Sequence, residues 1–317
     1  MRKNLVGILG ILALAAILFV GYHTTYNTSG APSAIKIATG GEAGVYYAYG
    51  NALANLLEKN MRITVTAIPS GGSADNINML RNDRAEMAFV QNDIMTYAYN
   101  GTNIFSTEEP FRDLCAVASL YHETCQVVAR RDVEGIADLR SRRVSIGAEG
   151  SGTELNALQI LESYNIRYTD INVEHLGFSE SVSAFRDGRI DAFFVTAGVP
   201  TPAVSQLALS GEARILSIGD ARARLIISQY PYYSRQIIPA GIYPGIDGEA
   251  ETVAVKATLA ASGGLNEQTV SEIMKIMFEN ASEIKGISGA AGLSREFAMQ
   301  GLSIPLHPGA EKFFLGR

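Results

Sequence analysis

One short unit recurs along the chain: a β-branched strand, a loop rich in glycine and hydroxyl residues, and then a helical stretch. Four copies read "IKIA-TGGEAG-VYYAYGNALANLLEKN", "ITVTAI-PSGGS-ADNINMLRN", "VSIG-AEGSGT-ELNALQILESY" and "FFVT-AGVPT-PAVSQLALS". Strands that alternate with helices predict an α/β protein with mainly parallel sheets. Ligands bind beyond the carboxyl ends of such strands, so the loops of this unit are the first candidate site.

A longer pattern, R-x-x-R-x-acid-x-x-F-V, occurs twice, as "RNDRAEMAFV" at 81–90 and "RDGRIDAFFV" at 186–195. Chance similarity of two helix–turn–strand pieces is the alternative explanation, but we favour two lobes of similar build. The strands would end at 91–93 in one lobe and 196–198 in the other, facing a shared cleft.

Two long extended segments, 115–132 and 251–262, are predicted to connect the lobes. They divide the chain into 35–121 (first part of lobe 1), 122–251 (lobe 2) and 252–317 (the return to lobe 1 with the C-terminal helices). Cys115 and Cys125, the two cysteines of the chain, fall in the outgoing segment. A disulfide between them and a pair of buried thiols are both open at this stage.

The first 34 residues differ from the rest, because Arg2 and Lys3 precede an apolar run from Leu5 to Val20 and a polar stretch follows. This layout predicts a secretory signal and a periplasmic location. An uncleaved anchor through residues 5–20 is the alternative, since no clear cleavage triplet follows closely. The net charge of −6 without a basic run argues against nucleic acid as a partner.

The stretch "GAEGSGTELNALQILE" at 147–162 reads as a glycine-rich turn that opens a helix. Ser151 and Glu154 form an S-x-x-E capping box, so the helix should begin near Ser151 with its free N–H groups over the loop. No lysine follows Gly150 or Gly152, which excludes a phosphate-binding P-loop. The loop suits a carboxylate, unless its glycines only form a tight turn.

Catalysis finds little support in the sequence. The chain lacks G-x-S-x-G, H-E-x-x-H and S-x-x-K motifs, and its four histidines are scattered without metal-ligand spacing. Glu154 is explained as a helix cap, and Glu42 and Glu149 as solvated loop charges. We therefore predict a protein that is not an enzyme and needs neither a metal nor a cofactor.

Several longer motifs resemble a known family: "GVYY", "PSGGSADNIN", "MAFVQND", "VSIGAEGSGTELNALQIL", "DAFFVTAG", "IPAGIY" and "IPLHPGAEKFF". In this order, from about residue 35 to 314, they resemble the TAXI-type (TRAP-associated extracytoplasmic immunogenic) solute-binding proteins of TRAP transporters. The resemblance implies a type II periplasmic binding protein fold, with two lobes joined by a two-strand hinge. It also implies capture of glutamate, glutamine or a related C5 dicarboxylate, and delivery to membrane subunits of the transporter.

Carried over by motif, the resemblance implies ligand contacts from Gly44, Val45, Tyr46, Ser70, Gly71, Gln91 and Asn92, and from Ser151, Gly152, Thr153, Thr196 and Gly198. The chain departs from the family pattern at Glu42 and Pro200, which leaves the exact solute open. The interpretation is thus a monomeric solute-binding protein for a small organic anion. The rival readings are a membrane-anchored ligand-sensing domain and, less favoured, an enzyme on the same fold.

Overall fold

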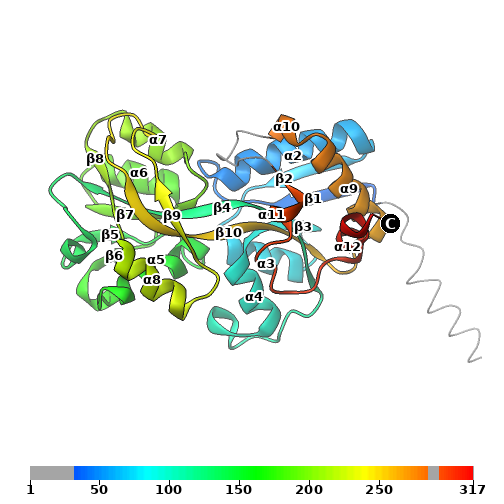
Figure 1. Ribbon diagram of the computed structural model, residues 1–317, viewed down its shortest axis with the longest axis horizontal. Coiled ribbons are helices and arrows are strands. Elements are labelled where there is room, and N and C mark those ends of the chain that lie inside the picture. The colour runs from blue at the N-terminus through cyan, green and yellow to red at the C-terminus, as the bar shows by residue number, and fades with distance from the viewer. Residues whose placement is uncertain (1–31, 285–292, 317) are drawn as a thin grey trace, which may run out of the picture.

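The computed structural model describes residues 32–284 and 293–316, and it shows two α/β lobes linked by two long strands (Figure 1). The predicted signal or anchor falls almost entirely outside the described residues. Within the described ranges, no helix has the length and apolar character needed to cross a membrane.

The first lobe is built from the first two copies of the strand–loop–helix unit. Its elements are β1 (Ala34–Ala38), α2 (Val45–Met61), β2 (Thr64–Ile68), α3 (Ser73–Arg81), β3 (Met87–Gln91) and α4 (Asn92–Asn100). Strand β1 lies between β2 and β3 and pairs with both in parallel. The three strands therefore end at one edge of the sheet, and α2, α3 and α4 each begin there.

The second lobe repeats this arrangement. Its elements are β5 (Arg143–Ser145), α5 (Gly152–Ser163), β6 (Asn172–Glu174), α6 (Phe178–Arg186), β7 (Ala192–Ala197), α7 (Pro202–Ala208), β8 (Ala213–Leu216), α8 (Asp220–Gln229) and β9 (Ser234–Ile238). Strand β5 pairs in parallel with β6 and β7. Short 3-10 turns cover Asn103–Phe105, Ile136–Leu139 and Tyr168–Asp170.

The repeated sequence pattern occupies equivalent places in the two lobes. Each copy runs from the last residue of a helix, α3 or α6, into a central strand, β3 or β7. The acidic residue of each copy accepts a backbone N–H from the neighbouring strand: Glu86 from Lys36 at 2.6 Å, and Asp191 from Arg143 at 3.0 Å. The acidic side chain at the equivalent position thus makes an equivalent bond in each lobe. This bond explains why the acidic residue recurs in both copies of the sequence pattern.

Two strands cross between the lobes, β4 (Leu114–Arg130) and β10 (Ala250–Ser262), and they pair antiparallel with each other (Figure 1). In the first lobe β10 pairs with β3, and this pairing ends at Gln91. In the second lobe β4 pairs with β7, and this pairing begins at Thr124. Residues 121–123 of β4 therefore lie at the passage from one lobe to the other.

The two cysteines both lie in β4 and both are free thiols, so the possible disulfide is wrong. An extended strand rises about 3.3 Å per residue, which separates Cys115 from Cys125 by roughly 30 Å. A disulfide needs Cα atoms within about 7 Å of each other. The sequence correctly predicted that both cysteines lie in extended structure. The disulfide is excluded because they lie in one continuous strand.

The chain returns to the first lobe through α9 (Glu267–Glu279), α10 (Ala281–Ile284), α11 (Arg295–Ala298) and α12 (Pro308–Leu315). Helices α9 and α10 pack on α2, and α12 packs on α9. His307 caps α12, because its Nδ1 accepts the N–H of Gly309 at 3.1 Å. Its Nε2 then donates to the carbonyl of Leu265 at 2.9 Å, which fixes α12 to the start of α9.

Candidate functional site

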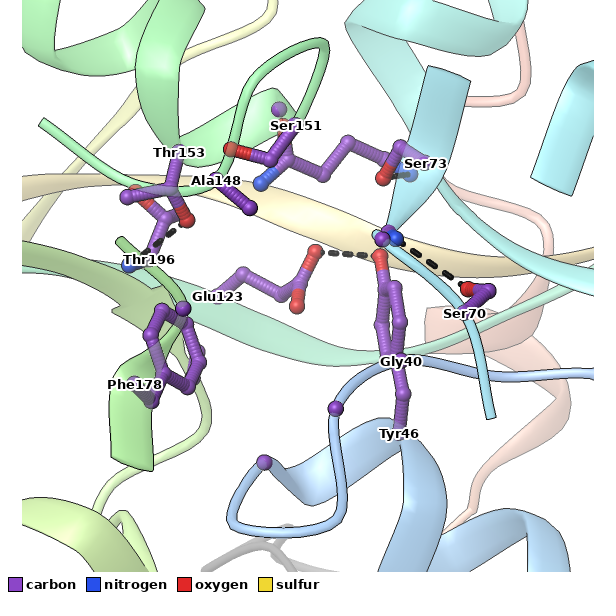
Figure 2. A pocket seen from close by; sticks show the side chains of 18 of the residues that line it. Gly40, Tyr46, Ser70, Ser73, Glu123, Ala148, Ser151, Thr153, Phe178 and Thr196 are labelled. Atoms are coloured by element: carbon purple, nitrogen blue, oxygen red, sulfur yellow. Dashed lines mark hydrogen bonds between the residues drawn. The ribbon is translucent and has the colours of Figure 1, made fainter. Parts of the chain in front are cut away.

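A cavity lies between the lobes, where the parallel strands of each lobe end. It measures about 110 Å³, counted as space open to the centre of a water-sized sphere. One water needs roughly 10–15 Å³ on that scale, so the cavity has room for a small organic molecule. Its lining (Figure 2) consists of Gly40, Gly41, Gly44, Val45, Tyr46, Ser70, Gly71, Gly72, Ser73, Gln91, Glu123, Ala148, Ser151, Gly152, Thr153, Gly177, Phe178, Thr196 and Ala197.

The lining includes every ligand contact expected from the sequence except Asn92 and Gly198. Asn92 is buried at the start of α4, and its side-chain oxygen accepts the N–H of Lys256 at 3.0 Å. The carbonyl of Gly198 accepts the hydroxyl of Thr201 at 2.7 Å. Both residues thus hold the chain in place behind the cavity wall. Glu42, which the sequence analysis interpreted as a solvated loop charge, is exposed and outside the lining.

Five helices begin at the cavity wall. The capping residues of α2, α3, α4, α5 and α6 are Gly44, Gly72, Gln91, Ser151 and Gly177, and all five line the cavity. The first N–H groups of a helix have no partner within it, and the helix dipole adds partial positive charge there. The lining contains no Lys, Arg or His side chain. The cavity can therefore hold an anion through backbone groups alone.

The start of α5 is ordered by its own side chains. The Ser151 hydroxyl accepts the N–H of Glu154 at 3.1 Å, as the capping box predicts. The Glu154 carboxylate accepts from Gly150 at 2.7 Å rather than from Ser151, whose N–H donates to the carbonyl of Ala148. The loop before the helix is thus tied at three points, which fixes the direction of the helix N-terminus.

Glu123 is a lining residue that the sequence analysis missed. It lies on β4 between the lobes, it is only 2% exposed, and its carboxylate accepts the Tyr46 hydroxyl at 2.7 Å (Figure 2). Burial raises the pKa of Glu123 to about 8, although hydrogen bonds from Tyr46 and Gln91 act in the opposite direction. The available signal was the one acidic residue in a mainly apolar strand, "CAVASLYHETCQVV".

Gln91 brings the two lobes into close contact. The side chain is 2% exposed, and its Oε1 has no hydrogen-bond partner among the described residues. A Cβ on Gly152, across the cleft in α5, would lie 2.0 Å from that oxygen. Only a glycine permits this approach, so the lobes are in a closed arrangement.

A second contact between the lobes lies behind the cavity. The carboxylate of Asp93, at the start of α4, accepts from the side-chain amide of Asn156 in α5 at 3.3 Å. The same amide nitrogen also donates to the Tyr233 hydroxyl at 2.6 Å. Burial raises the pKa of Asp93 to about 6, because the closed lobes exclude water from its carboxylate.

Two hydroxyl groups of the cavity are bonded to other parts of the protein. The Ser70 hydroxyl is bonded to the carbonyl of Thr39 and the side chain of Asn76. The Thr153 hydroxyl accepts the N–H of Thr196 at 3.3 Å. Neither has a histidine or lysine beside it as a base. Residues 32–284 and 293–316 contain no group of three His, Cys, Asp or Glu side chains arranged to hold a metal.

Residues 37–315, which make up most of the chain, match the NMT1-like family. The chain belongs to the NMT1-like family. The structure of this NMT1-like protein is similar to that of the alkanesulfonate-binding protein SsuA from Xanthomonas axonopodis pv. citri bound to MOPS. The TM-score is 0.50 at 15% identity, over 91% of this chain and 86% of that one.

Two further solved structures match. One is PhnD1 from Prochlorococcus marinus (MIT 9301) in complex with methylphosphonate, with a TM-score of 0.51 at 12% identity, over 81% of this chain and 89% of that one. The other is a TRAP periplasmic solute binding protein from Pseudomonas aeruginosa PAO1 with bound L-malate. Its TM-score is 0.47 at 13% identity, over 81% of this chain and 85% of that one. SsuA and PhnD1 confirm the predicted type II periplasmic binding protein fold.

Proposed function

We propose that this NMT1-like protein is an extracytoplasmic solute-binding protein that captures a small organic anion for a TAXI-type TRAP transporter. The observation that carries the proposal is the cavity between the two lobes, where five helices begin. Such helix starts stabilise negative charge, and the enclosed position keeps water from competing for their N–H groups.

Binding in this scheme is closure of the lobes around the solute. The first lobe offers the helix starts at Gly44 and Gly72, and the second offers those at Ser151 and Gly177. A ligand that contacts both lobes favours the closed state by that difference in contacts. Residues 121–123 of β4 lie where a hinge between the lobes is required.

The family resemblance extends the proposal beyond the cavity. The solute would be glutamate, glutamine or a related C5 dicarboxylate, and closure would be read by the membrane subunits of the transporter. Transport would then depend on an ion gradient rather than on ATP. We further propose a monomer in the periplasm, with lobe limits at 35–121, 122–251 and 252–317.

The test is a thermal-shift and calorimetric screen against C4–C6 carboxylates and amino acids. A true ligand raises the melting temperature by mass action and lowers the radius of gyration in small-angle scattering. Saturable binding without any change in compactness in solution would contradict the closure mechanism. N-terminal sequencing of the exported protein separates a released periplasmic protein from an anchored sensing domain, which would keep residues 5–20.

A further inference from the structure

Some of the residues that line the cavity keep contact with solvent, and they mark its mouth. The first lobe supplies the loops before α2 and α3, and the second lobe supplies the loop before α5 and the start of α6. Apart from Phe178, these mouth residues are small: Gly41, Ser70, Gly71, Gly72, Ala148 and Gly177. Phe178 is therefore the one large side chain at the mouth among the residues that line the cavity.

The Phe178 ring extends from the second lobe toward the first. Phe178 is the first residue of α6, and a Cβ built on Gly44 of the first lobe would lie 3.6 Å from Cδ2 and from Cε2 of the ring. That distance is ordinary van der Waals contact, so the space between Gly44 and the ring holds a methyl group and nothing larger. The ring also packs against a cluster of buried apolar residues that includes Val45, and turning outward would lose this contact.

The lobes also approach each other on the side where α3 and α5 begin. A Cβ on Gly72 would lie 3.6 Å from the Cβ of Ser151, and a Cβ on Gly152 would lie 2.0 Å from Oε1 of Gln91. In Figure 2 Phe178 lies on the same side of Glu123 as Gly40, and Ser151 lies on the other side. A solute enclosed by the closed lobes therefore has to fit between these two approaches.

We propose that Phe178 sets the longest solute that the cavity accepts, because its ring closes the mouth against Gly44. The inference rests on the proposed solute-binding function and names the residue that limits chain length within the solute class. A solute that reaches from the starts of α3 and α5 to those of α2 and α6 ends at the ring, because Phe178 directly follows Gly177, the cap of α6. A longer chain has to displace the ring or hold the lobes apart, and both disfavour the closed state.

The experiment measures the affinities of solutes that differ only in chain length. Calorimetry compares glutarate with pimelate, and glutamate with 2-aminopimelate; the longer member of each pair has the same end groups and two more methylene groups. We expect the unaltered protein to bind the shorter member more tightly. Phe178→Ala removes the ring and should shift the ratio of the two affinities toward the longer member by about 10-fold or more. Phe178→Leu keeps a shorter apolar side chain and should give a smaller shift in the same direction.

The matched control is Phe111→Ala in the first lobe. Phe111 is also a half-buried ring packed against a hydrophobic cluster, but it lies outside the lining. Its removal should lower the melting temperature without changing the ratio of affinities. Circular dichroism and the melting temperature show whether Phe178→Ala is folded. If it is not, Phe178→Leu carries the test by itself.

The outcomes separate the inference from the function on which it rests. An unchanged ratio of affinities in the folded Phe178 variants overturns the assignment of chain length to Phe178 and leaves solute capture standing. Equal affinity of the unaltered protein for both members of a pair overturns it as well. Binding of none of the four compounds overturns the proposed solute class and the inference with it.

Discussion

Gly152→Ala should prevent closure of the lobes while leaving each lobe intact. Gly152 is the first residue of α5 in the second lobe, and it faces Gln91 of the first. An added Cβ would lie 2.0 Å from Oε1 and 2.4 Å from Cδ of Gln91. Such carbon contacts ordinarily lie at about 3.5–4.0 Å, so the lobes must separate or Gln91 must move.

The size of the effect follows from the packing of Gln91. Its side chain is 2% exposed and lines the cavity, so moving it away from Gly152 would push it into the space that the ligand needs. Adding a methyl group to a packed interior costs about 1–3 kcal/mol. The cost falls only on the closed state, because the open lobes do not meet at this point. The ligand affinity should therefore fall by about 5- to 150-fold.

The assay is calorimetric titration with small-angle scattering at matched ligand saturation. The melting temperature of the empty protein should stay the same or rise slightly, because alanine favours a helix over glycine. Gly135→Ala is the matched control: the same substitution in the same lobe, where the new Cβ meets nothing within 4 Å. Unchanged affinity and full compaction in Gly152→Ala would show that closure does not bring Gly152 against Gln91.

Two further predictions concern buried ionisable groups and the C-terminal helices. Asp93 has a folded pKa of about 6 against an ordinary 3.8, so its ionisation lowers stability as the pH rises between these values. In Asp93→Asn the free energy of unfolding should exceed that of the unaltered protein by up to about 3 kcal/mol at pH 7 but not at pH 4, measured by urea unfolding. His307→Ala removes the cap of α12 and the bond to Leu265, and should lower the free energy of unfolding by about 1–3 kcal/mol without altering ligand affinity. A stability difference between Asp93→Asn and the unaltered protein that is the same at both pH values, or lost ligand affinity in the His307 variant, would refute the respective assignment.

Local patterns in the sequence determined the α/β class and most of the cavity wall. The strand–loop–helix unit fixes where helices begin, because glycine loops and capping residues act within a few neighbouring residues. The loops of this unit were therefore the first candidate site, the family resemblance named Gly44, Gly71 and Ser151 within them, and all three line the cavity. The paired R-x-x-R patterns likewise reported a bond that each lobe makes on its own.

Only the tertiary structure decided that Glu123 of strand β4 faces the cavity and that Asn92 and Gly198 do not. Alternation along β4 puts Glu123 on one face of the strand, but only the lobes folded over that face make the residue buried. Asn92 and Gly198 each come directly after a strand whose last residue lines the cavity. Their own polar groups are instead bonded to Lys256 and Thr201. The physical reason is range: caps and turns depend on adjacent residues, whereas burial of a carboxylate depends on segments far apart in the chain.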